Sequence, residues 1–267
     1  MKKLLISLAA VVVIAIVAIG SVFVVRDYRF NHIQTANLPP DTDFTQLKQT
    51  PIATASATSV ASKPTTASVT PVPKASTPPA ALNLKAPFYA QAPLGNWDYP
   101  WQEACEEASV LLAANEYFGH GWTVAQFNQQ ILDIVEWENK TFGDYKHTTM
   151  AQTSQMLKDY LKLDSKIHEN PDLSTIKQIL ANGHFIILPF AGKEVGNPYY
   201  NNGGPTYHVV LAKGYTADNQ IITHDVGTKH GENYVYDWET ISAALHDYSD
   251  PIDNGARRII EVFPPQA

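Results

Sequence analysis

The chain has 267 residues, which leaves room for one or two domains. It carries 19 Lys and Arg against 26 Asp and Glu, a formal net charge of −7, and this excess of acid argues against a nucleic-acid partner. A single cysteine, Cys105, excludes an intrachain disulfide and a zinc cluster built from cysteines.

The N-terminal segment is the most apolar part of the chain. Residues 4–25 carry no charged side chain, follow Lys2 and Lys3, and end before Arg26. As a helix the segment is roughly 30 Å long, enough to cross a bilayer, and the two lysines place its N-terminus in the cytoplasm. We therefore expect residues 1–26 to be a cytoplasmic tip and a single-pass anchor in the cell membrane, with the rest of the chain outside the cytoplasm. A cleaved secretory signal and a buried core helix are the alternatives.

Residues 27–83 have the composition of a linker. Between residues 51 and 80, 24 of 30 positions are Ala, Ser, Thr or Pro. Such a segment has no periodic apolar face, so burial cannot offset the entropy lost on ordering it. We predict a disordered linker over 27–83, followed by one folded domain over 84–267.

Within this domain, predicted helices come before predicted strands. Helical spacing of apolar residues and helix-start signals predict helices over 104–118, 124–138, about 149–161 and 173–182. Short apolar runs then predict strands over 185–190, 207–212, 220–225, 234–236 and 258–263. This order indicates an α+β fold in which N-terminal helices pack on an antiparallel sheet.

Cys105 is a candidate nucleophile because it lies at the start of a predicted helix. Unpaired N–H groups and the helix dipole favour a thiolate at that position. Glu106 and Glu107 oppose thiolate formation unless they face away from the sulfur. The structural alternative for Cys105 is a small buried apolar residue.

His208 and Asp225 are candidates for the partners of this thiol. His208 opens a predicted strand directly after the loop at 201–205, and Asp225 ends the next predicted strand. If the two strands are adjacent and antiparallel, the carboxylate lies beside the imidazole and can orient it. The alternatives are a hydrogen-bonded structural histidine and an aspartate that starts a turn.

Four segments together resemble a known family. They are AlaProPheTyrAlaGln at 86–91, GlnGluAlaCysGluGluAlaSer at 102–109, the run GlyGlyProThrTyrHisValValLeuAlaLysGlyTyr that contains His208, and HisAspValGlyThr around Asp225. In this order they resemble the stand-alone double-glycine-type, bacteriocin-leader-processing-like cysteine peptidases of the papain clan. The resemblance covers residues 84–263 and implies a papain-like fold with thiol hydrolase chemistry.

Site roles follow from the resemblance position by position. It makes Cys105 the nucleophile, His208 the general acid/base, and Asp225 the residue that orients the imidazole. Gln91 matches the family's glutamine and is the expected oxyanion donor, together with the backbone N–H of Cys105. Gln102 lies nearer to the cysteine in the sequence, and spacing alone leaves both glutamines open.

Two positions depart from the family's pattern. Ala104 stands where family members commonly have glycine, and it can crowd the approach of substrate. His224 and Val226 flank Asp225 where asparagine and proline are common, so a second imidazole near the site is possible. No metal ligand is predicted, because His224 and His230 lack a spacing that fixes three ligands.

The sequence thus predicts a membrane-anchored, extracytoplasmic cysteine peptidase that acts on peptide or protein substrates without a cofactor. A peptide-binding module that keeps the groove but has no turnover is an alternative of a different class. The same residues also suit an amidase or a transpeptidase that acts on cell-wall peptides.

Overall fold

Residues 38–47 and 77–265 are described by a computed structural model of the chain. The expected anchor and most of the expected linker lie outside these residues, so both stay predictions. Within the described ranges, no helix is long and apolar enough to cross a membrane.

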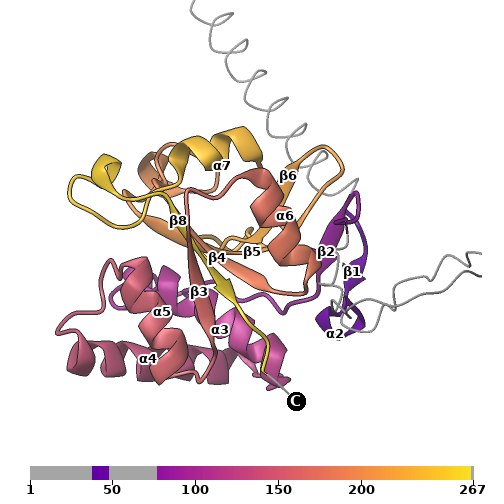
Figure 1. Ribbon diagram of the computed structural model, residues 1–267. Helices are drawn as coiled ribbons and strands as arrows, with labels where there is room; N and C mark the ends of the chain where they lie inside the picture. Colours follow the sequence, from indigo (N-terminus) through magenta and orange to yellow (C-terminus); the bar gives the residue numbers. More distant parts are fainter. Residues whose placement is uncertain (1–37, 48–76, 266–267) are drawn as a thin grey trace, which may run out of the picture. The chain divides into compact units, whose positions relative to one another are not determined.

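Three helices lie on one side of a central sheet (Figure 1). They are α3 (Cys105–Phe118), α4 (Val124–Thr141) and α5 (Met150–Asp159). Thr123 and Thr149 form capping boxes with Gln126 and Gln152, which explains why α4 and α5 begin where they were predicted. The first of these helices is buried over most of its length against the sheet, and it ends at Gly119, whose φ is 63°.

The sheet has eight strands. They are β1 (Asp41–Thr42), β2 (Leu82–Leu84), β3 (Ser165–Glu169), β4 (Phe185–Phe190), β5 (His208–Tyr215), β6 (Gln220–His224), β7 (Tyr234–Asp237) and β8 (Arg258–Val262). The hydrogen-bonded order is β1-β2-β5-β4-β8-β3, and β6 pairs with both β5 and β7. Every residue of β4 and β5 is buried, so these two strands form the centre of the core.

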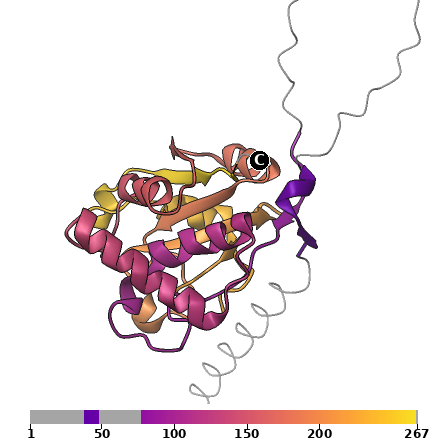
Figure 2. The same cartoon turned by 90° about the horizontal axis from the view of Figure 1, so that it is seen from below.

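Two further helices lie on the opposite side of the sheet. They are α6 (Leu173–Ala181), whose N-terminus is capped by Asp172, and α7 (Trp238–Ala244), which directly follows β7. Figure 1 shows the sheet between these helices and the group α3, α4 and α5, and Figure 2 views the domain from the side of that group. The result is an α+β domain whose helices and main strands follow the predicted order.

The boundary of the domain differs from the prediction. Strand β1 and the short helix α2 (Phe44–Leu47) lie inside the expected linker, as do two residues of β2. Asp41 and Thr42 pair with Asn83 and Leu84, and the ring of Phe44 packs 4.9 Å from that of Tyr117. The folded unit therefore begins at Pro40, because a short segment before the Ala/Ser/Thr/Pro-rich stretch adds an edge strand to the sheet.

The sheet is also mixed, where an antiparallel one was expected. The pairing of β1 with β2 is parallel, and all other strand pairs are antiparallel. Besides β1, α2 and β2, the strand β3 and the helix α7 were not predicted. Strand β3 has the sequence SerLysIleHisGlu and is half-exposed, so it lacks the apolar run that marked the other strands.

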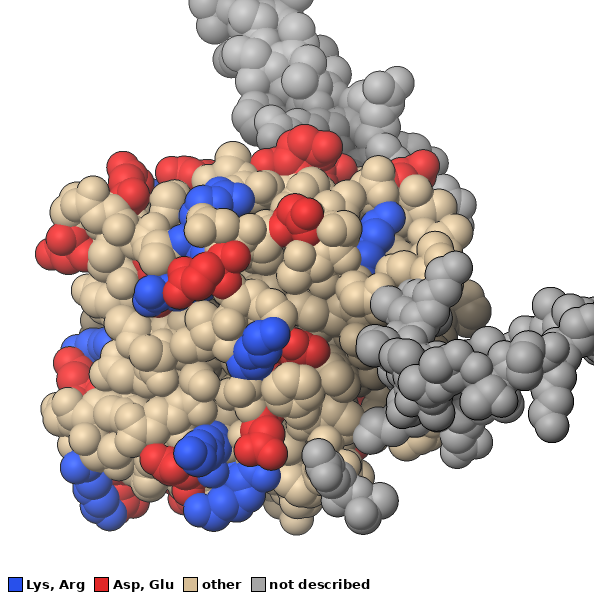
Figure 3. Space-filling view, viewed as in Figure 1, with Lys and Arg blue, Asp and Glu red and all other residues tan. Residues whose placement is uncertain are grey.

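The surface carries both charge signs. On the face shown in Figure 3, acidic and basic side chains are interspersed over the described part of the chain. The expectation that the protein has no nucleic-acid partner stays a prediction from its net charge.

Candidate active site

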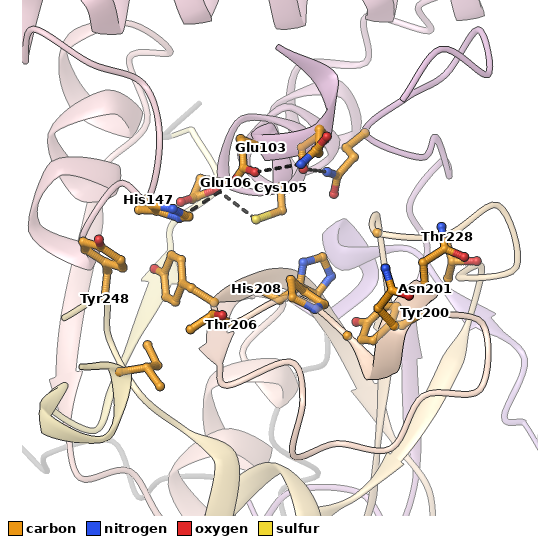
Figure 4. A pocket seen from close by; sticks show the side chains of 18 of the residues that line it. Glu103, Cys105, Glu106, His147, Tyr200, Asn201, Thr206, His208, Thr228 and Tyr248 are labelled. Carbon is orange, nitrogen blue, oxygen red and sulfur yellow. Dashed lines mark hydrogen bonds and ion pairs between the residues drawn. The ribbon is translucent and has the colours of Figure 1, made fainter. Parts of the chain in front are cut away.

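A cavity of about 1200 Å³ opens between the N-terminal end of α3 and the start of β5. Its wall includes Cys105 and His208, together with the loops 199–207, 227–230 and 248–252. Figure 4 shows Cys105 projecting from the helical side of the cavity and His208 from the strand side. The cysteine is 6% exposed and the histidine 2%, so both side chains reach the cavity while remaining largely shielded from solvent.

Cys105 is the first residue of α3, directly after the 3₁₀ turn η1 (Trp101–Glu103). Ala104 joins the two elements with φ −97° and ψ 34°, and its side chain is fully buried. This position therefore does not need glycine, and its methyl group does not stand in the cavity. The backbone of Val209, the residue after His208, is near enough to the sulfur to favour its thiolate form, so Cys105 lies beside β5.

His208 and Asp225 form a buried pair, as their strand positions predicted. Strands β5 and β6 are antiparallel, with Leu211 opposite His224, so Asp225 follows the end of β6 near the start of β5. His208 Nε2 lies 2.8 Å from Asp225 Oδ1. Because the carboxylate can only accept, Nε2 carries the proton of this hydrogen bond, and Nδ1 is the ring nitrogen left to accept another proton.

The carboxylate of Asp225 is surrounded by donors that sequence reasoning missed. Its Oδ2 accepts from Tyr236 Oη at 2.6 Å, Tyr200 Oη at 2.7 Å and Asn197 Nδ2 at 2.9 Å. Burial opposes ionisation, but His208 and these hydrogen bonds outweigh it and hold the pKa of Asp225 below its usual value. Tyr236 belongs to a strand that was predicted, whereas the loop residues Asn197 and Tyr200 carry no local signal.

Position 227 requires glycine because it lies close to the imidazole of His208. A Cβ at this position would lie 2.6 Å from His208 Cε1 and 2.8 Å from Nε2, which is closer than atoms can approach. The backbone N–H of Gly227 also donates to Asp225 Oδ1 at 3.0 Å. Any side chain here would displace the histidine ring from its place in the cavity wall.

Both candidate oxyanion glutamines line the cavity. Gln91 is buried, and its Nε2 donates to the carbonyls of Trp101 and Gln102 at 2.8 and 3.0 Å. Its Oε1 is buried without a hydrogen-bond partner among the described residues. Gln91 thus braces the turn before Cys105, while the side chain of Gln102 donates to Glu103 Oε1 at 3.3 Å. Which glutamine faces an oxyanion stays a prediction.

The helical side of the cavity holds buried carboxyl groups. The thiol of Cys105 donates to Glu106 Oε2 at 2.9 Å, so Glu106 does not face away from the sulfur. Burial, followed by the charge of Glu107, raises the pKa of Glu106 well above its usual value. Burial and the neighbouring Glu106 likewise raise the pKa of the Cys105 thiol. Both effects favour the protonated thiol.

His224 lies away from the cavity. Its Nε2 is 3.1 Å from the carbonyl of Ala86, and its Nδ1 accepts from the backbone N–H of Asn233 at 3.2 Å. Burial and the nearby Lys213 lower the pKa of His224 to about 3, so its ring is neutral. It adds no second imidazole to the site. Across the described ranges, no group of three His, Cys, Asp or Glu side chains is arranged to hold a metal ion.

Comparisons with known proteins find a family model and solved structures that are similar to this chain. The family model described as "Peptidase_C39 like family" matches residues 83–250. A putative C39-like peptidase from Bacillus anthracis is 14% identical, with 68% of this chain and 96% of that chain covered and a TM-score of 0.45. Xylellain, a cysteine protease from Xylella fastidiosa, is 16% identical, with 71% and 87% covered and a TM-score of 0.36. None of the curated proteins is a significant match.

Proposed function

The chain belongs to the Peptidase_C39-like family and is a cysteine peptidase, and from that premise we propose that it cleaves peptide bonds through Cys105, His208 and Asp225. The observation that carries this proposal is the buried His208–Asp225 pair, because its histidine lines the same cavity as the only cysteine of the chain. Peptide or protein chains are the substrates that this chemistry implies.

The proposed reaction starts with a proton transfer. The S–H bond of Cys105 breaks, and the proton moves to Nδ1 of His208, giving a thiolate and an imidazolium. Asp225 is ionised and hydrogen-bonded to Nε2, so it stabilises the positive ring and fixes its orientation. The thiolate then attacks the peptide carbonyl, and His208 gives its proton to the leaving amine. Water, deprotonated by His208, finally releases the acyl group from the sulfur.

The tetrahedral intermediate needs donors for its oxyanion. The N-terminus of α3 offers the backbone N–H of Cys105, because the first N–H groups of a helix have no partner within it. We assign the side-chain donor to Gln91, which must release the carbonyl of Trp101 or of Gln102 to donate to the oxyanion. Gln102 is the alternative, since it also lines the cavity.

A direct test compares the full chain with Cys105→Ser and His208→Ala in a peptide hydrolysis assay. The activity of each variant should fall to the background rate, because a nucleophile and its base act as one unit. The melting temperature of each variant should stay close to that of the wild type. Peptide binding with no turnover in the wild type would instead favour a silent binding module. Release of an amide group or transfer to an amine, without peptide cleavage, would favour an amidase or a transpeptidase.

We further propose that the domain is held outside the cytoplasm by an anchor at residues 4–25. The support is the uncharged apolar run and the preceding Lys2 and Lys3. Protease added to intact spheroplasts should release the domain from the membrane. A domain protected from protease would overturn this orientation, and a soluble mature form that starts near Ser21 would replace the anchor with a cleaved signal.

A further inference from the structure

We infer that Glu106 is a catalytic residue that acts as a neutral carboxylic acid, donating its O–H to the sulfur of Cys105 when the thiolate forms. The inference rests on the proposed role of Cys105 as the nucleophile, and it extends that role to a residue outside the Cys–His–Asp set. It starts from the 2.9 Å contact between Glu106 Oε2 and Cys105 Sγ, which lies inside the wall of the cavity.

The surroundings of Glu106 keep it neutral. Its side chain is 1% exposed, and its Oε1 has no hydrogen-bond partner among the described residues. No Lys, Arg or His of the described chain forms an ion pair with it. A carboxylate buried without a cation is costly, so such a group holds its proton instead.

Apart from His208, the titratable groups around Glu106 are acidic or phenolic. Glu107 lies beside it on α3, and Glu138 faces it from α4. Tyr207 lies near it at the start of β5, where burial and Glu106 raise the pKa of the phenol. His147 also lines the cavity, but its Nδ1 lies 3.7 Å from Glu103 Oε2. His208 is the basic group across the cavity, and it is engaged by Asp225.

A carboxylate and a carboxylic acid at this contact have opposite effects on the sulfur. A carboxylate would repel the thiolate at 2.9 Å and would keep the S–H bond intact. A carboxylic acid offers an O–H donor along the same line, once the thiol proton has moved to His208 Nδ1. The Glu106 proton stays on its own oxygen throughout, so the step only reverses the direction of one hydrogen bond.

The carboxylic acid and the carboxylate form of Glu106 predict opposite effects of substitutions at this position. Glu106→Gln keeps a hydrogen-bond donor of similar shape but cannot carry a charge. Glu106→Leu has neither a donor nor a charge. If Glu106 is a neutral donor, Gln should stay within a few-fold of the wild type, while Leu should slow the reaction of Cys105 roughly 10- to 100-fold, the range for a lost hydrogen bond to a charged group. If Glu106 is a carboxylate, both variants should react faster than the wild type.

The experiment is the alkylation rate of the full chain by iodoacetamide at neutral pH, which reports on Cys105 alone because it is the only cysteine. Glu116→Gln, the same change near the other end of α3, is the matched control and should leave the rate unchanged. A Gln variant that reacts tenfold faster than the wild type overturns the inference, even if the Leu variant does not fold. Peptide hydrolysis that survives Cys105→Ser would overturn the proposed function itself, which is a separate outcome.

Discussion

Buried carboxyl groups on the two sides of the cavity have pKa values that are shifted in opposite directions. On the strand side, both oxygens of Asp225 accept hydrogen bonds, and the pKa of this carboxyl is lowered. On the helical side, Glu106 and Glu107 have buried oxygens without partners among the described residues, and their pKa values are raised, chiefly by burial. One wall therefore supplies a fixed negative charge to the imidazole, while the other keeps acid groups neutral beside the sulfur. The comparison teaches that hydrogen-bond donors, and not burial alone, decide the charge of each carboxyl group.

The largest expected effect on the strand side comes from Asp225→Asn. A neutral amide cannot stabilise the imidazolium, and its NH₂ group would meet the hydroxyls of Tyr200 and Tyr236. We expect kcat/KM to fall roughly 10²–10⁴-fold, with partial activity left because the ring is misoriented and not removed. Steady-state kinetics with a peptide substrate measure this.

Tyr236→Phe is the matched milder change, since it removes one donor and keeps the carboxylate. It should cost about tenfold, in line with one hydrogen bond to a charged group. Wild-type kinetics in Asp225→Asn would show that the charge on this wall has no part in the reaction.

An intermediate effect is expected from the glutamines between the two walls. Gln91→Ala should lower kcat roughly 10²–10³-fold if Gln91 donates to the oxyanion. Its amide nitrogen also holds the carbonyls of Trp101 and Gln102, so its melting temperature must be compared with that of the wild type. If kcat is unchanged in Gln91→Ala but strongly reduced in Gln102→Ala, the oxyanion donor is Gln102 and not Gln91.

The smallest effect concerns stability on the helical side. Burial raises the pKa of Glu138 from 4.5 to about 8, so the folded protein keeps a proton that the unfolded chain releases. The free energy of unfolding should therefore fall as pH rises between these two values. Glu138→Gln removes this contribution, and it should be more stable than the wild type at the upper end of the range, by on the order of 2 kcal/mol.

Urea unfolding at the two ends of that pH range measures the difference. Glu136→Gln, an exposed position on the same helix, is the control and should not alter the slope. An unchanged pH dependence in Glu138→Gln would mean that this carboxyl is already ionised in the folded state.

The sequence was most informative where a local rule determines the structure. Thr123 and Thr149 marked the starts of two helices because a capping box is complete within four residues. The pairing of His208 with Asp225 followed from strand order, because an antiparallel neighbour returns the chain to the same edge.

Contacts between distant segments were not predictable in this way. Asn197 and Tyr200 reach Asp225 from a loop whose path depends on the whole domain. Asp41 and Thr42 join the sheet although they were assigned to the linker, because two residues carry too little pattern to mark a strand. Glu106 was noted only as a charge that disfavours the thiolate, since its burial and lack of a cation are properties of the packed fold.

The central claim is that His208 activates Cys105 as the nucleophile of a peptidase. The most direct measurement is covalent labelling of the full chain with a peptidyl chloromethyl ketone, followed by intact mass analysis and mapping of the modified residue. The account predicts one adduct, on Cys105, and a labelling rate that falls roughly 100-fold or more in a folded His208→Ala variant. Equal labelling rates in the two proteins, or an unlabelled wild type that still hydrolyses peptides, would contradict it.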